Sequence, residues 1–382
     1  MNNKEKGLSF MGAFSVASVW FGAHVGGGFA SGSQTMSFFI RYGKYAVIFS
    51  VLSMVIVALT YRENMIMARH YKAYDYNSLG KVMFQPYERF MSPVYDICYI
   101  AAGMLAVSAS VAGAAELITQ VIGLPYFVSV LLIGSLTLVL SVFGSELVSK
   151  ASTVLSIAIV VSFLIICLKG ITQNTTVLSQ NLQAPMEDGM FMKGLIKAIS
   201  YAGFQCFAFL GLLGATSLTK TNKDCTSVTV IGFVLNAGMI ALTVLLIQAF
   251  MPQVANETLP ILATSQAMGG GFLTVLYSIA LFSAFLSTAV AVVYGNTMRF
   301  TRLFKEKGVG KQDGKLLPVL VGIVIIAISM AVASVGLTKI IAVGYSYFGY
   351  IGIFLVIIPS LTYCRMRNKK YKEENLVNKE TL

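Results

Sequence analysis

Apolar stretches of roughly 20 residues recur along almost the whole of this 382-residue chain. A helix needs that length to cross the hydrocarbon core of a bilayer. Charged residues make up only 12% of the sequence, about half of their share in a soluble domain, so the chain lacks the polar surface that water requires. The ten-residue alternating pattern of a membrane β-barrel is absent. The sequence therefore predicts an all-α, multi-pass membrane protein.

The apolar stretches predict ten membrane-spanning helices. Their expected bounds are 8–40, 43–69, 90–122, 125–143, 147–169, 190–218, 226–251, 270–300, 316–334 and 338–364. The first and the sixth contain glycine-rich segments, and we expect both to be discontinuous. The polar tail 365–382 is expected to lie in the cytoplasm and to be disordered.

The basic residues predict the orientation of these spans. With the N-terminus inside, 22 of the 28 lysines and arginines fall in inner segments. Because basic residues gather on the cytoplasmic side of membrane proteins, both termini are predicted to be cytoplasmic, in a bacterial inner membrane. The net charge of +12 thus reflects topology and does not indicate a nucleic-acid partner. Segment 252–269, with two prolines and almost no charge, is expected to be an outer loop that covers the binding site.

The chain divides into two similar halves. Residues 1–170 and residues 171–364 each contain five predicted spans, and each half opens with an interrupted one. Since five is odd, the second half must enter the membrane with inverted orientation. Interrupted helices at matching places in inverted repeats mark the binding site of a secondary transporter.

The first candidate site is the segment 22–32, Gly-Ala-His-Val-Gly-Gly-Gly-Phe-Ala-Ser-Gly. Each of its five glycines would weaken a helix by roughly 1 kcal/mol relative to alanine. Unwound backbone is tolerated at membrane depth where it lines a cavity, and free amides at a helix start suit a carboxylate. The alternative is a glycine face that lets helices pack closely. The predicted substrate-binding residues here are Ala23, His24, Gly26, Gly27 and Gly28, and Gly32 is expected within the outer half-helix.

His24 admits three interpretations. A histidine at this depth needs hydrogen-bond partners. It could contact the substrate, it could titrate and couple protons, or it could stay neutral and cap freed backbone groups.

The second candidate site is the segment 200–211 of the sixth span. A break between Gly203 and Gly211 would place a second pair of helix ends opposite the first. Phe204, Phe207 and Phe209 could then wall a pocket for an apolar side chain, with the Gln205 amide beside them. The alternative is an intact helix with aromatic packing. Tyr345 and its aromatic neighbours in the tenth span are either packing residues or a gate.

The third candidate site lies in the eighth span. Ala284, Ser287 and Thr288 share one helical face at i, i+3 and i+4. Two hydroxyls and a carbonyl offer hard oxygen ligands to an alkali cation. The alternative is that both hydroxyls only bond back to their own helix.

These three segments resemble LeuT-fold transporters of the amino acid–polyamine–organocation superfamily, and residues 22–32 resemble its YkvI-like group of amino-acid permeases. The resemblance implies a LeuT-like fold of two inverted five-helix repeats and one Na⁺ as coupling ion. It assigns the ion to the carbonyls of Gly22, Val25 and Ala284 and the hydroxyls of Ser287 and Thr288. The family's amide at a second sodium site falls on Ala23, so that site is not expected. Proton-coupled relatives carry a lysine in the fifth span, where this chain has residues 156–159, Ser-Ile-Ala-Ile.

The sequence thus predicts a secondary transporter, most simply a sodium symporter for an amino acid or a related small zwitterion. A proton-coupled carrier or an exchanger of the same fold is the alternative, and a channel or a membrane sensor is the next. An enzyme would need clustered histidines, acids or cysteines, whereas the five cysteines sit singly and no Walker-type loop is present. The expected partners are a small-molecule substrate and the lipid bilayer, without an obligate protein partner.

Overall fold

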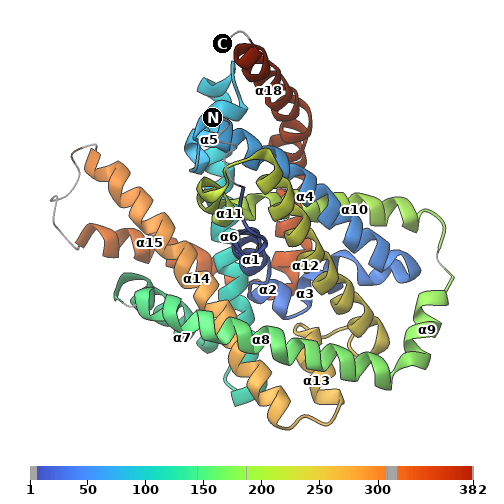
Figure 1. Ribbon diagram of the computed structural model, residues 1–382. Helices are drawn as coiled ribbons and strands as arrows, with labels where there is room; N and C mark the ends of the chain where they lie inside the picture. The colour runs from blue at the N-terminus through green and yellow to red at the C-terminus, as the bar shows by residue number, and fades with distance from the viewer. Residues whose placement is uncertain (1–6, 144, 186, 307, 309–315, 381–382) are drawn as a thin grey trace.

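The structure is a computed structural model that describes residues 7–143, 145–185, 187–306, 308 and 316–380, and these residues form helices without strands (Figure 1). The long helices coincide with the predicted spans. They are α1 (Phe10–His24), α4 (Ala46–Tyr71), α6 (Glu88–Ile122), α7 (Tyr126–Phe143), α8 (Ser145–Gln173), α10 (Met190–Gln205), α12 (Asn222–Ala249), α14 (Phe272–Glu306) and α15 (Leu316–Ala333). The tenth span is built from α16 (Leu337–Lys339), α17 (Ser346–Gly352) and the π-helical segments Ile340–Tyr345, Ile353–Ile357 and Ser360–Cys364. The shorter helices are α2 (Gly27–Ala30), α3 (Ser33–Phe38), α5 (Tyr76–Met83), α9 (Thr175–Gln183), α11 (Leu210–Ala215) and α13 (Pro260–Ala267).

Seven of the described helices are long and apolar enough to cross a membrane, and two bent helix pairs raise that number to nine. The bent pairs are α8 with α9, at 80°, and α10 with the helix that follows it, at 52°. The all-helical membrane class is therefore confirmed. The broken segment 10–38, which is the first predicted span, is not among these nine, and the count of ten stays a prediction.

The break in the first span falls where the glycines predict it. The helix α1 ends at His24, and both Val25 and Gly26 have non-helical backbone angles before α2 begins. A second interruption follows, because Gly32 has a φ of 85°, in the left-handed region that favours glycine. Gly32 is thus the N-cap of α3, and the expectation that it lies inside a half-helix is wrong.

The break in the sixth span lies between the two glycines that predict it, but Gly203 has another role. The helix α10 continues through Gly203 to Gln205, and a 3₁₀ turn over Cys206–Phe209 leads into α11. A Cβ added to Gly203 would stand 2.1 Å from the Gly349 carbonyl oxygen of α17. Gly203 therefore permits the close packing of α10 on the tenth span, and the turn residues make the break.

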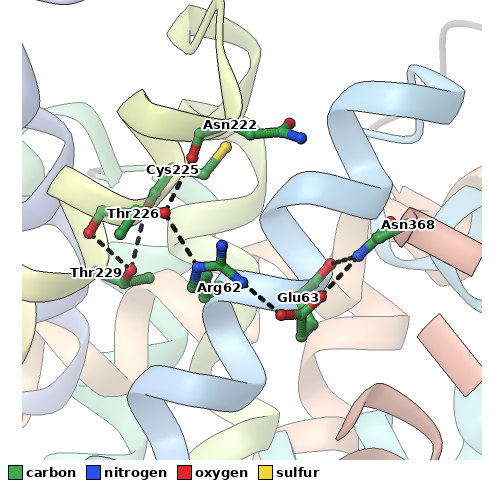
Figure 2. A network of polar contacts seen from close by, with 7 residues as sticks. All are labelled: Arg62, Glu63, Asn222, Cys225, Thr226, Thr229 and Asn368. Atoms are coloured by element: carbon green, nitrogen blue, oxygen red, sulfur yellow. Dashed lines mark hydrogen bonds and ion pairs between the residues drawn. The ribbon is translucent and has the colours of Figure 1, made fainter. Parts of the chain in front are cut away.

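The C-terminal tail is helical as far as Glu380, where the described residues end, and the prediction of disorder is wrong for this part. The helix α18 (Arg365–Glu380) continues from the tenth span. The Asn368 amide donates to both the main-chain oxygen and the side-chain carboxylate of Glu63 at the end of α4, each at 3.0 Å (Figure 2). Arg62 pairs with the same carboxylate at 2.6 Å and donates to Thr226 of α12 at 3.0 Å. These contacts to buried acceptors order the start of the tail.

The predicted inner segments meet at one end of the molecule. The Leu8 amide donates to the Asp224 carboxylate at the start of α12, and Arg69 of α4 donates to the Lys220 carbonyl. Figure 1 shows α5 and α18 at this end, and α13 at the opposite end. The Ile261 amide of α13 donates to the Ser31 carbonyl beside the first break. Segment 252–269, predicted to be an outer loop, therefore lies over that break.

Topology reporters test this sidedness. A reporter fused after Lys223 should report the cytoplasm, and a reporter fused after Asn256 should report the outside, because these positions lie at opposite ends of α12. Alkaline phosphatase and a fluorescent protein, each fused to the full preceding chain, report an outside and a cytoplasmic position, respectively. The matching position Lys311 lies outside the described residues. Cytoplasmic signals at both Lys223 and Asn256 would contradict the inverted-repeat topology.

Candidate functional site

A cavity of about 510 Å³ lies against the inner half of the broken first span. Its walls come from α1 with the break, from α8 and from α14. The lining residues are Ser18, Phe21, Gly22, Val25, Gly26, Ile157, Ile159, Val160, Val161, Ala280, Ser283, Ala284, Ser287 and Thr288. All five residues assigned to sodium by resemblance are among them, so the structure brings this predicted set together.

The two α14 hydroxyls have a geometry that leaves oxygen lone pairs available. Ser287 Oγ donates to the Ala284 carbonyl at 3.2 Å, and Thr288 Oγ1 donates to the same carbonyl at 2.8 Å. Each hydroxyl donates its one hydrogen in this bond, and its oxygen can still accept. Bonding back to the helix is therefore compatible with binding a cation, which needs oxygen acceptors and no donors. A Cβ added to Gly26 would stand 3.3 Å from Thr288 Oγ1, so the break lies directly beside these oxygens.

Two further hydroxyls line the same cavity and were not predicted from the sequence. Ser18 precedes Gly22 by four residues, and Ser283 precedes Ser287 by four residues, so each lies one helical turn away on the same face. That spacing was the signal that could have found them. The α8 wall contributes only isoleucine and valine side chains among its described lining residues.

Gly27 is a packing position. A Cβ added there would stand 2.1 Å from Cδ1 of Phe285, and a Cβ added to Gly113 of α6 would stand 2.2 Å from the same ring. The Phe285 ring is fully buried and lies against both of these glycines. Gly27 thus brings the break against α14, which combines the two interpretations of the glycines: the segment is unwound and it also packs closely.

The predicted aromatic wall is dispersed over three partners. Phe204 stacks on Tyr345 with ring centroids 3.8 Å apart. Phe207 meets Phe348 edge-on, whereas Phe209 lies against Tyr61 of α4. Phe204 lies in the last turn of α10, whereas Phe207 and Phe209 lie in the 3₁₀ turn that follows, and the three rings contact different partners.

Gly28 and Phe204 are nevertheless close, because both lie near Tyr345. A Cβ added to Gly28 would stand 2.8 Å from Nε2 of Gln34 and 3.8 Å from the Tyr345 hydroxyl. The first amides of α2 have no helical carbonyl one turn earlier, since Val25 and Gly26 are not helical. The side-chain amide of Gln34 and these backbone amides lie together, and an anionic group would find several donors there.

The remaining predicted residues lie on either side of the break. Ala23 is exposed, and a Cβ added to Gly211 of α11 would stand 3.7 Å from its methyl group. Gln205 is buried and donates from Nε2 to Gln34 Oε1 at 3.2 Å. His24 is 4% exposed, and both of its ring nitrogens have protein partners: Asn236 Oδ1 at 2.6 Å and the Tyr201 hydroxyl at 2.9 Å.

Comparisons with known proteins give the fold. No protein-family model matches this chain, and no curated protein sequence does. Among solved structures, MhsT in complex with L-phenylalanine is similar, with a TM-score of 0.63 and 14% identity over 97% of this chain and 99% of that one. A manganese transporter from Eremococcus coleocola is similar with a TM-score of 0.62 and 15% identity, over 92% of this chain and 78% of that one. The chain has the LeuT fold.

This fold explains why the two broken helices lie side by side. In such transporters the discontinuous helices of the two repeats meet near the bilayer midplane. Here the first break contacts the α10 region through Gln34 and Gln205, and the cavity extends from that break between α8 and α14. The fold is thus confirmed, whereas the YkvI-like grouping stays a prediction.

Proposed function

We propose that this protein is a secondary active transporter of a bacterial inner membrane, which moves an amino acid or a related small zwitterion together with sodium. One observation carries the proposal. The five residues assigned to the ion come from helices more than 250 residues apart in sequence, and all five line one cavity beside a broken helix. The similarity to transporter structures supports alternating access as the mechanism.

The cavity suits sodium in its chemistry. Its polar side chains are the hydroxyls of Ser18, Ser283, Ser287 and Thr288, and oxygen atoms are the ligands that hard cations prefer. Ser287 and Thr288 each donate their hydrogen to the Ala284 carbonyl, so their oxygen lone pairs would be left to bind a cation. The apolar α8 wall offers no ammonium group among its described lining residues, which favours sodium over the lysine arrangement of proton-coupled relatives.

The substrate would bind on the other face of the break. Its carboxylate would accept hydrogen bonds from the first amides of α2 and from Gln34 Nε2, close to Gly28. Its apolar part would contact the stacked rings of Phe204 and Tyr345. That MhsT is known in complex with L-phenylalanine supports an amino acid as the substrate class.

Sodium entry would supply enough free energy for uptake. One charge that moves through about 100 mV releases about 2.3 kcal/mol, which corresponds to roughly 50-fold accumulation.

Concentrative uptake in proteoliposomes tests the proposal. The purified protein, given an inward sodium gradient, should accumulate at least one of the twenty L-amino acids above its external concentration. An equal potassium gradient should give no accumulation. Equilibration without accumulation under both gradients would identify a channel instead. Accumulation driven equally by both cations would remove sodium from the proposal.

A further inference from the structure

A second layer of side chains lies one helical turn outward from the proposed substrate site. In the inner layer, the Tyr201 hydroxyl of α10 donates to Gln34 Oε1 of α3 at 3.2 Å. One turn away on the same two helices, toward the predicted outer end, lie Lys197 and Phe38. The Lys197 ammonium stands 5.5 Å from the centre of the Phe38 ring. Lys197 thus belongs to the outer layer, about 6 Å along the helix axis from the inner one.

Lys197 is held by a neutral partner that leaves most of its donors available. Its ammonium donates to the Ser346 hydroxyl at 2.7 Å, and Ser346 gives its own hydrogen to the Ala342 carbonyl. Ser346 directly follows Tyr345, whose ring stacks on Phe204. An ammonium has three N–H donors, so two of them have no partner among the described residues and remain for a ligand.

The charge of Lys197 has no opposite charge beside it in the described part of the chain. No described carboxylate lies within ion-pair distance of its ammonium, and the charged side chain that acts on it is Arg41, which has the same sign. Lys197 is nevertheless half-buried within an apolar span. A lysine in such a place is costly without an anionic partner and marks a functional site.

The donors of the two layers match a ligand with two carboxylates. The inner layer offers the first amides of α2 and Gln34 Nε2, close to Gly28. The outer layer offers the ammonium of Lys197. In aspartate and glutamate the two carboxylates are separated by the α-carbon and by one or two methylene groups, a span comparable with one helical turn. A neutral amino acid would satisfy only the inner set of donors.

A neutral side chain would be disfavoured at the outer layer. It would displace water from Lys197 and offer no matching charge, which leaves donors of a cation poorly paired. A site that hydrogen-bonds one substrate group rejects the analogue that lacks it for the same reason. Glutamine is the informative analogue, because it has nearly the shape of glutamate and lacks the negative charge.

We propose that the substrate class is the acidic amino acids and that Lys197 binds the side-chain carboxylate. This inference rests on the proposed function and narrows its substrate. The α-carboxylate is bound beside Gly28 and Gln34 Nε2, and the methylene groups lie against the stacked rings of Phe204 and Tyr345. The side-chain carboxylate accepts charge-assisted hydrogen bonds from Lys197 and supplies the missing negative charge.

Calorimetry on the purified full chain, at constant sodium concentration, tests this substrate class. L-Glutamate and L-aspartate should each bind at least about tenfold tighter than L-glutamine and L-asparagine, as a charge-assisted contact requires. The variant K197M should remove this preference, with glutamate weakened by the same factor and glutamine bound as by the wild type. The variant K197R keeps the charge and should retain a preference for glutamate.

The matched control is K193M, because Lys193 lies one turn farther outward on α10 and is exposed. Its loss should leave the preference for glutamate unchanged. Equal weakening of glutamate and glutamine in K197M would mean that Lys197 holds the shared α-carboxylate or the fold, and it would overturn the inference. Tighter binding of glutamine than of glutamate by the wild type would overturn it too. The proposed function fails by a separate result, the absence of sodium-driven accumulation of any amino acid in proteoliposomes.

Discussion

Removal of both α14 hydroxyls of the cavity, by Ser287→Ala together with Thr288→Val, should abolish the stimulation of amino-acid uptake by sodium. Each change deletes one oxygen from the proposed ion site and adds neither charge nor appreciable volume. The loss of two ligands should weaken sodium binding at least about tenfold, or ~1.4 kcal/mol. Uptake by proteoliposomes is measured against sodium concentration at constant ionic strength.

The matched control for this experiment is Ser283→Ala. Ser283 lines the same cavity and also donates to its own helix, at the Ile279 carbonyl, but it is outside the predicted ligand set. Its sodium dependence should be close to that of the wild type. Unchanged sodium dependence in the double variant would refute the proposed ion site. Loss of sodium stimulation in the Ser283→Ala control alone would mean that the ion binds one turn along α14.

Gly27→Val should abolish amino-acid binding and lower the thermal stability of the protein. The expected reason is steric, because the new Cβ would meet the Phe285 ring at 2.1 Å and Gly113 of α6 also lies against that ring. Overpacking of a well-packed core costs about 1–3 kcal/mol, and a ring that cannot yield would push α2 and its free amides away from the site. Thermal unfolding and calorimetric binding on monodisperse protein measure the two effects.

A double-mutant cycle with Phe285→Ala separates this clash from other causes. Phe285→Ala alone should cost about 3–5 kcal/mol for the lost packing. In that background Gly27→Val should add little, because the ring that it would meet is gone. Gly238→Ala in α12 is the matched control, since nothing lies within 4 Å of a Cβ added there. If the losses of stability in the two single variants simply add in the double variant, the clash with Phe285 is not the cause, and Gly27 matters to the site only through its backbone conformation. Gly32→Ala would not be a mild change, because the φ of 85° at Gly32 strains any other residue.

The resemblance on which the ion site rests concerns backbone carbonyls and two hydroxyls, and the sequence could place these well. A glycine-rich break and an i, i+3, i+4 set of oxygens are local patterns. The structure contains both local patterns: α1 ends at His24, and both hydroxyls lie on one face of α14. The two patterns meet in one cavity, although no local pattern required this.

The aromatic and amide residues of the sixth span could be located but not interpreted. The break at Cys206–Phe209 lies between the predicted glycines. The directions of Phe207 and Phe209 depend on the 3₁₀ geometry of that turn, and all three rings, with Phe204 of α10, depend on partners in α4 and the tenth span. The contact of Asn236 with His24 was not predicted either, although a polar side chain in an apolar span indicates a hydrogen-bond partner.

The sequence by itself determined the class of this protein and the places where its helices break. Hydrocarbon demands apolar segments of a set length, and each glycine weakens a helix by roughly 1 kcal/mol relative to alanine, so both features follow from local composition. Only the tertiary structure decided which partners the residues at the breaks have. Gly203 packs on Gly349, and His24 bonds to Asn236, 212 residues away. The tail, which is polar enough to be disordered, is ordered at its start by contact with Glu63. These contacts join segments that are far apart in the chain, and their energies depend on close approach in three dimensions, which no local pattern specifies.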